Sequence, residues 1–182
     1  MLKHLALLVL SVAAASAQMQ VLDLGARGKV TLYIPGEWKA ATTDMAGTYA
    51  VTLTPASDSV NASCQLSVTF PETDRFDTKA RLKLRVEADG YGLAEQSVER
   101  KAYAQELKVG TGYGSFCNFT DPALQGRPPE KGNHKVTTLG KVRLDAAVLL
   151  EFQILSDGFG TEPHQQLLGA LEGLEFAPGR GR

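Results

Sequence analysis

One run of residues organises this chain: Leu107-Lys-Val-Gly-Thr-Gly-Tyr-Gly-Ser-Phe-Cys-Asn-Phe-Thr-Asp-Pro122. If its second half is extended, successive side chains point to opposite faces of a sheet. The glycines at positions 110, 112 and 114 would allow a bend or a close approach of neighbouring backbone, and the Asp-Pro pair would end the strand. The run therefore predicts a central β-strand. On one face it would present Tyr113, Ser115, Cys117 and Phe119, and on the other Phe116 and Asn118.

Alternating apolar side chains predict further strands on both sides of this run. For residues 97–109, whose pattern is mixed, interrupted strands are favoured over a helix. The last two predicted strands would pair as a hairpin. The predicted strands cover residues 30–34, 49–54 and 64–70 before the run, and residues 136–144 and 148–155 after it.

Apolar residues at helical spacing predict two helices. The first would be capped by Thr73 or Asp74, run to about Ala88 and stop at Gly90. The second would begin after Thr161. The expected buried stripes are Phe76, Ala80 and Leu84 in the first helix, and Leu167, Leu168, Leu171 and Leu174 in the second. This order of elements predicts the α+β class, with an antiparallel sheet covered by two main helices.

The amino terminus has the layout of a secretory signal peptide. A lysine at position 3 is followed by an apolar run over residues 5–12 and by the small-residue site Ala15-Ser-Ala17. The alternative, a retained membrane anchor, is disfavoured because the apolar run is shorter than the roughly 20 residues that a bilayer requires. We expect a signal peptide at residues 1–17, a single α+β domain at 18–176 and a disordered tail at 177–182. The expected location is periplasmic or secreted, with no membrane span after cleavage.

Charge is nearly balanced along the chain. The 182 residues carry 19 basic and 20 acidic side chains, which gives a formal net charge of −1. Without a strongly basic face, nucleic acid is not expected as a partner. Lys79, Arg81, Lys83 and Arg85 form a basic run, but acidic residues flank it, so a solvated helix face with internal ion pairs is favoured over a docking patch.

Two cysteines, Cys64 and Cys117, are the only ones in the sequence. In an oxidising compartment an even number of cysteines favours a disulfide, which would add about 4 kcal/mol of stability for a loop of this length. The alternative is a pair of buried thiols on strands that are not adjacent, since geometry decides whether a bond can form. We expect the Cys64–Cys117 disulfide.

The turn Ile34-Pro-Gly-Glu-Trp38, together with the order of elements around it, resembles the PsbP and Mog1-like superfamily. The order comprises paired strands, a helix after Pro71, a meander and a last helix after Ser156-Asp157. The resemblance spans roughly residues 21–176 and implies a PsbP/Mog1-like sandwich, an antiparallel sheet between helices. It also implies a non-enzymatic role, since members act as assembly factors, binders of small GTPases, chaperone-like adaptors and accessory proteins of photosystem II. No functional residue carries over from it.

The sequence shows no recognisable catalytic constellation, metal-ligand spacing or cofactor motif. The glycine run at 110–114 leads into a strand, whereas a phosphate-binding loop must open a helix. Ser115 lacks the flanking glycines of a nucleophile elbow. A hydrolase that pairs Ser115 or Cys117 with His134 is therefore the least favoured hypothesis, and we expect neither enzymatic activity nor a cofactor.

The loop between residues 121 and 135 is the predicted interaction segment. A Pro-Pro pair stiffens it, which lowers the entropy lost when a partner orders it. Its candidate binding residues are Arg127, Lys131, His134 and Lys135. The favoured function is thus an exported, non-catalytic domain that binds a protein partner in an assembly, adaptor or inhibitor role. The alternative is a carrier that holds a small apolar ligand in a cavity between sheet and helix.

Overall fold

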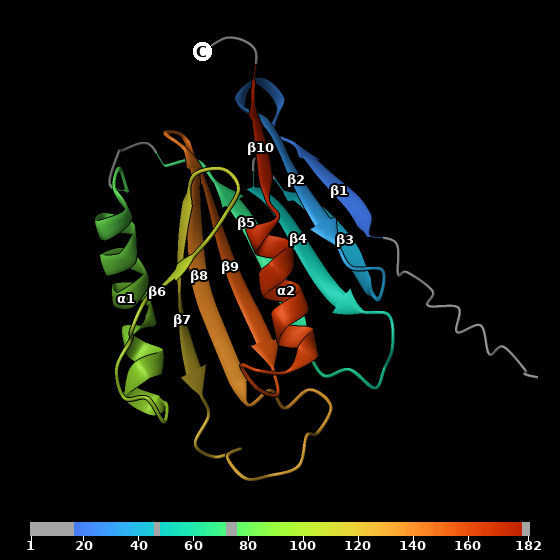
Figure 1. Ribbon diagram of the computed structural model, residues 1–182, viewed down its shortest axis with the longest axis vertical. Helices are drawn as coiled ribbons and strands as arrows, with labels where there is room; N and C mark the ends of the chain where they lie inside the picture. The colour runs from blue at the N-terminus through green and yellow to red at the C-terminus, as the bar shows by residue number, and fades with distance from the viewer. Residues whose placement is uncertain (1–16, 46–47, 72–75, 180–182) are drawn as a thin grey trace, which may run out of the picture.

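The structure is a computed structural model that describes residues 17–45, 48–71 and 76–179 (Figure 1). Within these ranges the chain forms β-strands, two α-helices and one short 3₁₀ turn. In chain order they are β1 (Gln18–Asp23), η1 (Gly25–Arg27), β2 (Gly28–Ile34), β3 (Trp38–Met45), β4 (Thr48–Pro55), β5 (Ser63–Thr69), α1 (Lys79–Gln96), β6 (Gln105–Leu107), β7 (Tyr113–Thr120), β8 (Val136–Asp145), β9 (Val148–Ser156), α2 (Glu162–Glu172) and β10 (Glu175–Pro178).

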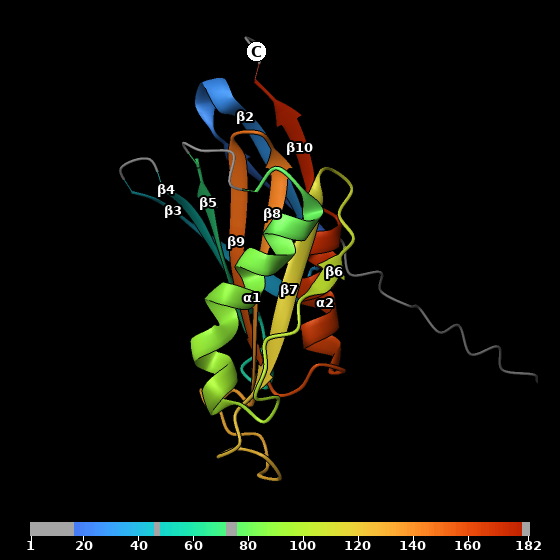
Figure 2. The same ribbon diagram turned by 90° about the vertical axis from the view of Figure 1, so that its left-hand side faces the viewer.

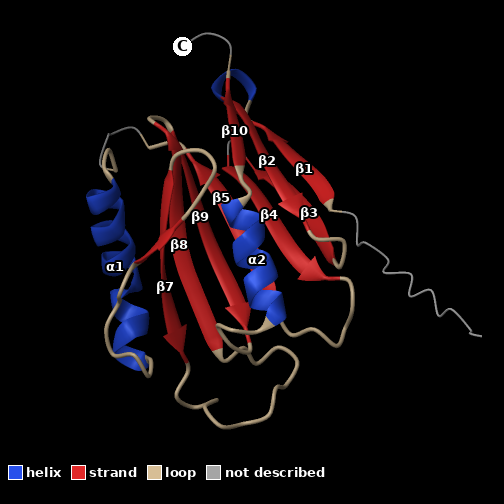
Figure 3. Ribbon diagram, in the orientation of Figure 1, coloured by secondary structure: helices blue, strands red, loops and turns tan. Residues whose placement is uncertain are grey.

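The strands form two antiparallel sheets. The larger sheet has the order β3-β4-β5-β9-β8-β7-β6, and the smaller has the order β1-β2-β10. Helix α1 lies on one face of the larger sheet, over β7 and β8, while α2 and the smaller sheet lie on the other face (Figures 1 and 2). The α+β class is confirmed, and Figure 3 shows the helices flanking the strands on both sides. The small sheet was not predicted.

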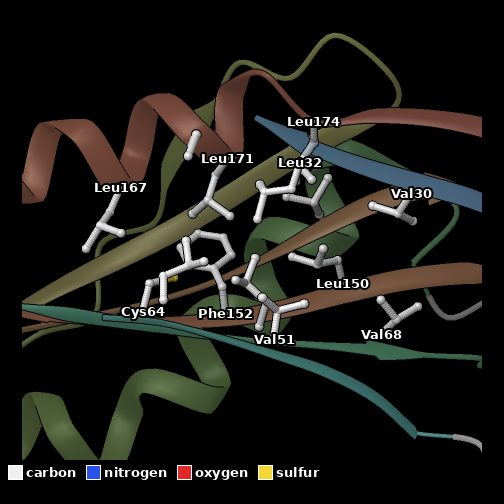
Figure 4. Packing of buried hydrophobic residues seen from close by; sticks show 14 of the residues in the cluster. Val30, Leu32, Val51, Cys64, Val68, Leu150, Phe152, Leu167, Leu171 and Leu174 are labelled. Atoms are coloured by element: carbon white, nitrogen blue, oxygen red, sulfur yellow. The ribbon is translucent and has the colours of Figure 1, made fainter. Parts of the chain in front are cut away.

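The main core fills the space between the larger sheet and the layer made by α2 and the small sheet. Alternate residues of β9, from Val148 to Ile154, point into it, and Cys64 of β5 lies beside them. Figure 4 shows the leucines of α2, Leu167 and Leu171, pointing toward Cys64 and Phe152. The predicted stripe is therefore confirmed in part: Leu167, Leu171 and Leu174 are buried, although Leu174 lies beyond the helix, whereas Leu168 is half-buried. A second, smaller cluster lies under α1.

The strand of the quoted run, β7, is not central. Only the three-residue strand β6 lies between it and the edge of the sheet, and β9 occupies the middle position. The predicted division of its faces is right, because Cys117 and Phe119 pack under α1 while Phe116 joins the main core. Alternation along a strand reports which side chains share a face, and it carries no information on how many strands lie beyond.

Helix α1 differs from its prediction. The hydroxyl of Thr78 accepts a hydrogen bond from the Arg81 amide at 3.2 Å and caps the helix, whereas the predicted caps at 73 and 74 lie outside the described residues. The helix continues through Gly90 to Gln96. Its buried residues are Leu82, Val86, Gly90 and Ala94. Of the predicted stripe, Ala80 and Leu84 face solvent, and Phe76 lies before the helix and is half-buried. Gly90 and Ala94, the small members of this set, allow the second half of the helix to lie close to the sheet. The prediction relied on the spacing of larger apolar side chains.

The ends of the predicted domain also differ. Strand β10 includes Ala177 and Pro178, which pair with Lys29 and Gly28, so the segment predicted as a disordered tail begins inside a strand. Residues 1–16 of the predicted signal peptide lie outside the described residues, so its cleavage stays a prediction. Among the residues that are described, no helix has the length and apolar character needed to cross a membrane.

Candidate functional site

The loop predicted to bind a partner connects β7 to β8 and protrudes beyond the end of the larger sheet (Figure 1). Lys131 forms an exposed ion pair with Asp58 at 2.8 Å, and its hydrogen bond lowers the pKa of that carboxyl. His134 instead lies in a hollow beside the end of α1. The Lys135 carbonyl accepts a hydrogen bond from the Asp121 amide, and Arg127 is exposed. Lys131 and His134 thus contact different parts of the molecule.

The side chain that orders this loop is Asn61, which sequence reasoning did not select. Its amide nitrogen donates to the carbonyls of Glu130 and Asn133, at 3.1 and 3.2 Å, and to the Asp157 carboxylate at 2.7 Å. Its oxygen accepts from the Gly132 amide at 3.0 Å. One side chain therefore connects the loop tip to two other segments. An asparagine in the segment before a strand gives no local signal of such distant partners.

The predicted disulfide is wrong, because both cysteines are free and buried. Strands β5 and β7, which carry Cys64 and Cys117, are separated by β9 and β8. Three strand spacings amount to about 14 Å, whereas a disulfide joins Cα atoms less than about 7 Å apart. The two side chains also belong to cores on opposite faces of the sheet. The structure therefore agrees with the alternative to the disulfide, in which two buried thiols lie on strands that are not adjacent.

The structure also separates the residues of the hydrolase hypothesis. Cys117 pairs with Leu139, five residues along the chain from His134, so the two lie roughly 15 Å apart along the strand direction. Ser115 is farther away, and its buried hydroxyl donates to the Gln105 carbonyl at 2.8 Å. In the described parts of the chain, no group of three or more acidic, histidine or cysteine side chains is arranged to hold a metal.

A buried lysine connects α1 to the sheet. Lys141 of β8 is 8% exposed, and its ammonium lies 2.6 Å from the Glu151 carboxylate of β9 and 3.1 Å from Asp89 of α1. Arg85 pairs with the same Asp89 at 2.9 Å. A hollow of about 320 Å³ borders this network. Each of these charges has an opposite charge at hydrogen-bond distance, so the network links α1 to β8 and β9.

The outer face of the small sheet carries exposed apolar side chains. Met19 of β1 is 65% exposed and lies directly opposite Tyr33 of β2, which is 39% exposed. Val21, also exposed, is two residues farther along β1. The Tyr33 hydroxyl donates to Glu175 of β10 at 3.2 Å, which raises the tyrosine pKa and holds the ring across the face. We call Met19, Val21 and Tyr33 the β1 surface.

A cavity of about 520 Å³ lies between α2, β7 and the segment that leads into β6. We call it the α2 cavity. Its floor contains His164, which is completely buried and whose Nδ1 lies 2.9 Å from the hydroxyl of Ser156. The ring of Phe159 packs edge-on against the imidazole, with centroids 6.1 Å apart. The lining includes Glu99, Lys101, Tyr103, Phe116, Asn118 and Leu168.

Two polar groups of the α2 cavity have unusual environments. Burial lowers the pKa of His164, so the imidazole is neutral near pH 7, and its Nε2 has no hydrogen-bond partner among the described residues. For Glu99, burial opposes ionisation, but hydrogen bonds from the amide and hydroxyl of Thr120 outweigh it and lower the pKa. The cavity therefore combines a neutral, unpaired imidazole with an ionised carboxylate that is already satisfied.

No family model matches the chain, and no curated protein matches it. Among solved structures, the chain is similar to the Ran-binding protein Mog1p of Saccharomyces cerevisiae, with a TM-score of 0.45 and 15% sequence identity. The likeness covers 88% of this chain and 96% of the yeast chain.

Proposed function

We propose that the protein is an exported, non-catalytic domain that binds a protein partner through the β1 surface. The observation that carries the proposal is the combination of Met19, Val21 and Tyr33, exposed on one face, with the unpaired backbone edge of β1 beside them. Exposed apolar side chains next to an open edge are uncommon on a free protein surface, because such edges recruit other strands.

The other sheet edges carry features that discourage pairing. Within the described residues, β6 has only three residues, β10 contains Pro178, and β3 carries the exposed Lys39. In β1 the single charge is Asp23, which is paired at 3.3 Å with Lys29 on the neighbouring strand. Proline, charge and short length are the usual protections of an edge. Strand β1 therefore has the least protection.

This geometry favours an extended segment of the partner, which would add to the small sheet as a fourth strand. Main-chain hydrogen bonds to β1 would supply affinity, and alternate apolar side chains of the segment would contact Met19 and Val21. The Tyr33 ring, already held by Glu175, loses little freedom on binding. Export is supported by the charged, apolar and A-x-A pattern of residues 1–17, which would leave Gln18 as the first residue of β1.

The test is site-specific photo-crosslinking in the native host. A photoreactive residue at position 19 is compared with one at Leu84, which is equally exposed on α1. The affinity of the crosslinked protein is then measured with the variant Met19→Lys/Val21→Lys, whose charges would oppose strand pairing, and with Leu84→Lys as the control. The double variant should weaken binding by at least about tenfold. Unchanged affinity of the double variant, or an equal loss with Leu84→Lys, would contradict the proposed surface.

The 121–135 loop stays a second prediction for the same function. Of its candidate residues, Arg127 and Lys131 are exposed, and Lys131 would have to leave Asp58 to meet an acidic partner. The triple variant Arg127→Ala/Lys131→Ala/Lys135→Ala is assayed with the same crosslinked partner. If it binds as tightly as the parent protein, the loop is not the binding segment.

A further inference from the structure

We propose that the α2 cavity binds a small aromatic anion, such as an aromatic carboxylate. The site is separate from the β1 surface and does not depend on it, since its residues come from α2, β7, residues 99–105 and the turn before α2. Its volume of about 520 Å³ falls within the usual range for small-molecule sites.

The first argument is the unpaired imidazole. His164 is 0% exposed, and its Nε2 has no hydrogen-bond partner among the described residues. Folded proteins rarely leave a buried polar atom without a partner, so such an atom points to a missing ligand group. The Ser156 hydroxyl is closer to Nδ1, at 2.9 Å, than to the Gly158 carbonyl, at 3.4 Å. The proposal takes the tautomer in which Ser156 donates to Nδ1, so that the proton stands on Nε2 and the ring presents a donor to the ligand.

The second argument is that the lining offers donors for an anion, although the amide oxygens of Gln105 and Gln165 also border the cavity. Lys101 forms no ion pair in the described part of the chain. The oxygen of the Asn118 side chain accepts from the Thr138 hydroxyl at 2.6 Å, which leaves its amide nitrogen to donate. The one carboxylate of the lining, Glu99, already accepts two hydrogen bonds from Thr120. A ligand with acceptor oxygens and a negative charge fits this set.

The third argument is that the apolar lining is aromatic. Phe116 of β7, Phe159 before α2 and the exposed Tyr103 supply three aromatic rings around the cavity. Such rings favour a flat aromatic body, which can pack against their faces and edges. Phe159 covers His164 and lies between Gly158 and Gly160. Because glycines allow a wide range of backbone conformations, we infer that Phe159 turns aside when a ligand reaches Nε2.

The test uses 2-naphthoate as the probe and the full domain as the protein. Calorimetry measures its affinity, and a long-range ¹H–¹⁵N spectrum follows the ring nitrogens of His164. We expect saturable binding with a shift of the His164 Nε2 resonance. Lys101→Gln should weaken 2-naphthoate about tenfold and leave the neutral 2-naphthamide unaffected. Lys108→Gln, an exposed lysine outside the cavity lining, is the matched control.

Several results would overturn the proposal. They are no binding at millimolar 2-naphthoate, binding without a change at His164, or equal affinity for the acid and the amide. A further check separates the two proposals, because Met19→Lys/Val21→Lys alters a surface outside the cavity and should bind 2-naphthoate normally. If the β1 surface proves not to bind a partner, the assignment of the α2 cavity is unaffected. If the α2 cavity proves not to bind 2-naphthoate, the proposal for the β1 surface is unaffected.

Discussion

Gly90 of α1 lies against the ring of Phe119 of β7, so closely that a Cβ atom at Gly90 would be 2.6 Å from the ring's Cζ. Real Cβ atoms do not approach a carbon at this distance. The glycine therefore sets how near α1 lies to the sheet, although a glycine in a helix interior costs about 1 kcal/mol relative to alanine. The contact explains why a glycine occupies this interior position of α1, where the helix had been predicted to end.

The variant Gly90→Ala should be less stable than Gly92→Ala by about 1–3 kcal/mol. Both substitutions gain the same helix propensity, but an added Cβ at Gly92 meets nothing within 4 Å, whereas at Gly90 it collides with Phe119. The difference between the two therefore isolates the steric term. Urea unfolding of both variants measures it. Equal stabilities would mean that Phe119 can move away without cost.

Replacing Lys141 by Met should destabilise the protein by about 1–3 kcal/mol. This loss is smaller than the one expected when one partner of a fully buried ion pair is removed. The change leaves Glu151 and Asp89 without their shared cation, but these side chains are 41% and 30% exposed and regain some hydration. Lys131→Ala, which breaks an exposed pair with Asp58, should change stability by less than about 0.5 kcal/mol. The prediction fails if the two variants unfold at the same urea concentration.

Both thiols should be free and unreactive in the folded protein. Burial raises the pKa of Cys64, and burial together with the charge of Glu87 raises that of Cys117 to about 11. Because the thiolate is the reactive form, iodoacetamide at about pH 8 should modify neither residue until urea unfolds the chain. Mass spectrometry counts the adducts. An intact mass lower by two hydrogens would instead indicate the disulfide.

The stability of the protein should depend on His164 below about pH 6.5. Burial lowers the pKa of the folded-state imidazole from its ordinary value of 6.5. As pH falls through that value, the unfolded chain takes up a proton that the folded chain does not, so the folded state loses stability. Urea unfolding at about pH 7.5 and about pH 5 compares the parent protein with His164→Gln.

The parent should lose more stability than His164→Gln over this range, because the variant lacks the titrating group. The other charged side chains that line the cavity, Glu99 and Lys101, are present in both proteins, so the comparison isolates the effect of His164. Parallel pH profiles for the two proteins would show that His164 titrates alike in the folded and unfolded chains.

Asn61→Ala should release the tip of the 121–135 loop. The substitution removes the hydrogen bonds to Glu130, Asn133, Gly132 and Asp157, although the Glu130 carbonyl keeps its bond from the Asn133 amide. Hydrogen exchange at the Gly132 amide should become faster, with a loss of about 1–2 kcal/mol in stability. Asn133→Ala removes one side-chain hydrogen bond to Glu130 and serves as the control. Unchanged protection of Gly132 in Asn61→Ala would show that Asn61 does not hold the loop.

Strands that bury one face were predictable from alternation. Val148–Ser156 and Ser63–Thr69 place an apolar residue at every second position, and both form strands close to the predicted ranges. In contrast, β3 contains Ala, Thr and charged residues and was not predicted. It forms a strand because its backbone pairs with β4 over the full length of the strand. Such pairing depends on the neighbour and leaves no pattern in the strand itself.

The α2 cavity could not be predicted for a related reason. Its residues come from positions 99–118 and 159–168, and the Ser156–His164 contact joins a strand end to a helix start. In the sequence, His164 is one of several polar residues in a first helical turn. Only the packing of α2 onto the sheet buries its ring and leaves Nε2 without a partner.

Residue order alone was sufficient for the α+β class, the main strands and the buried stripe of α2, because period and side-chain polarity are local properties of a segment. The tertiary structure decided the central position of β9, the buried face of α1 and the separation of Cys64 from Cys117. Each of these depends on which distant segments become neighbours. Spacing along the sequence shows which side chains share a face of a helix or strand. The free energy of packing decides which distant segment covers that face.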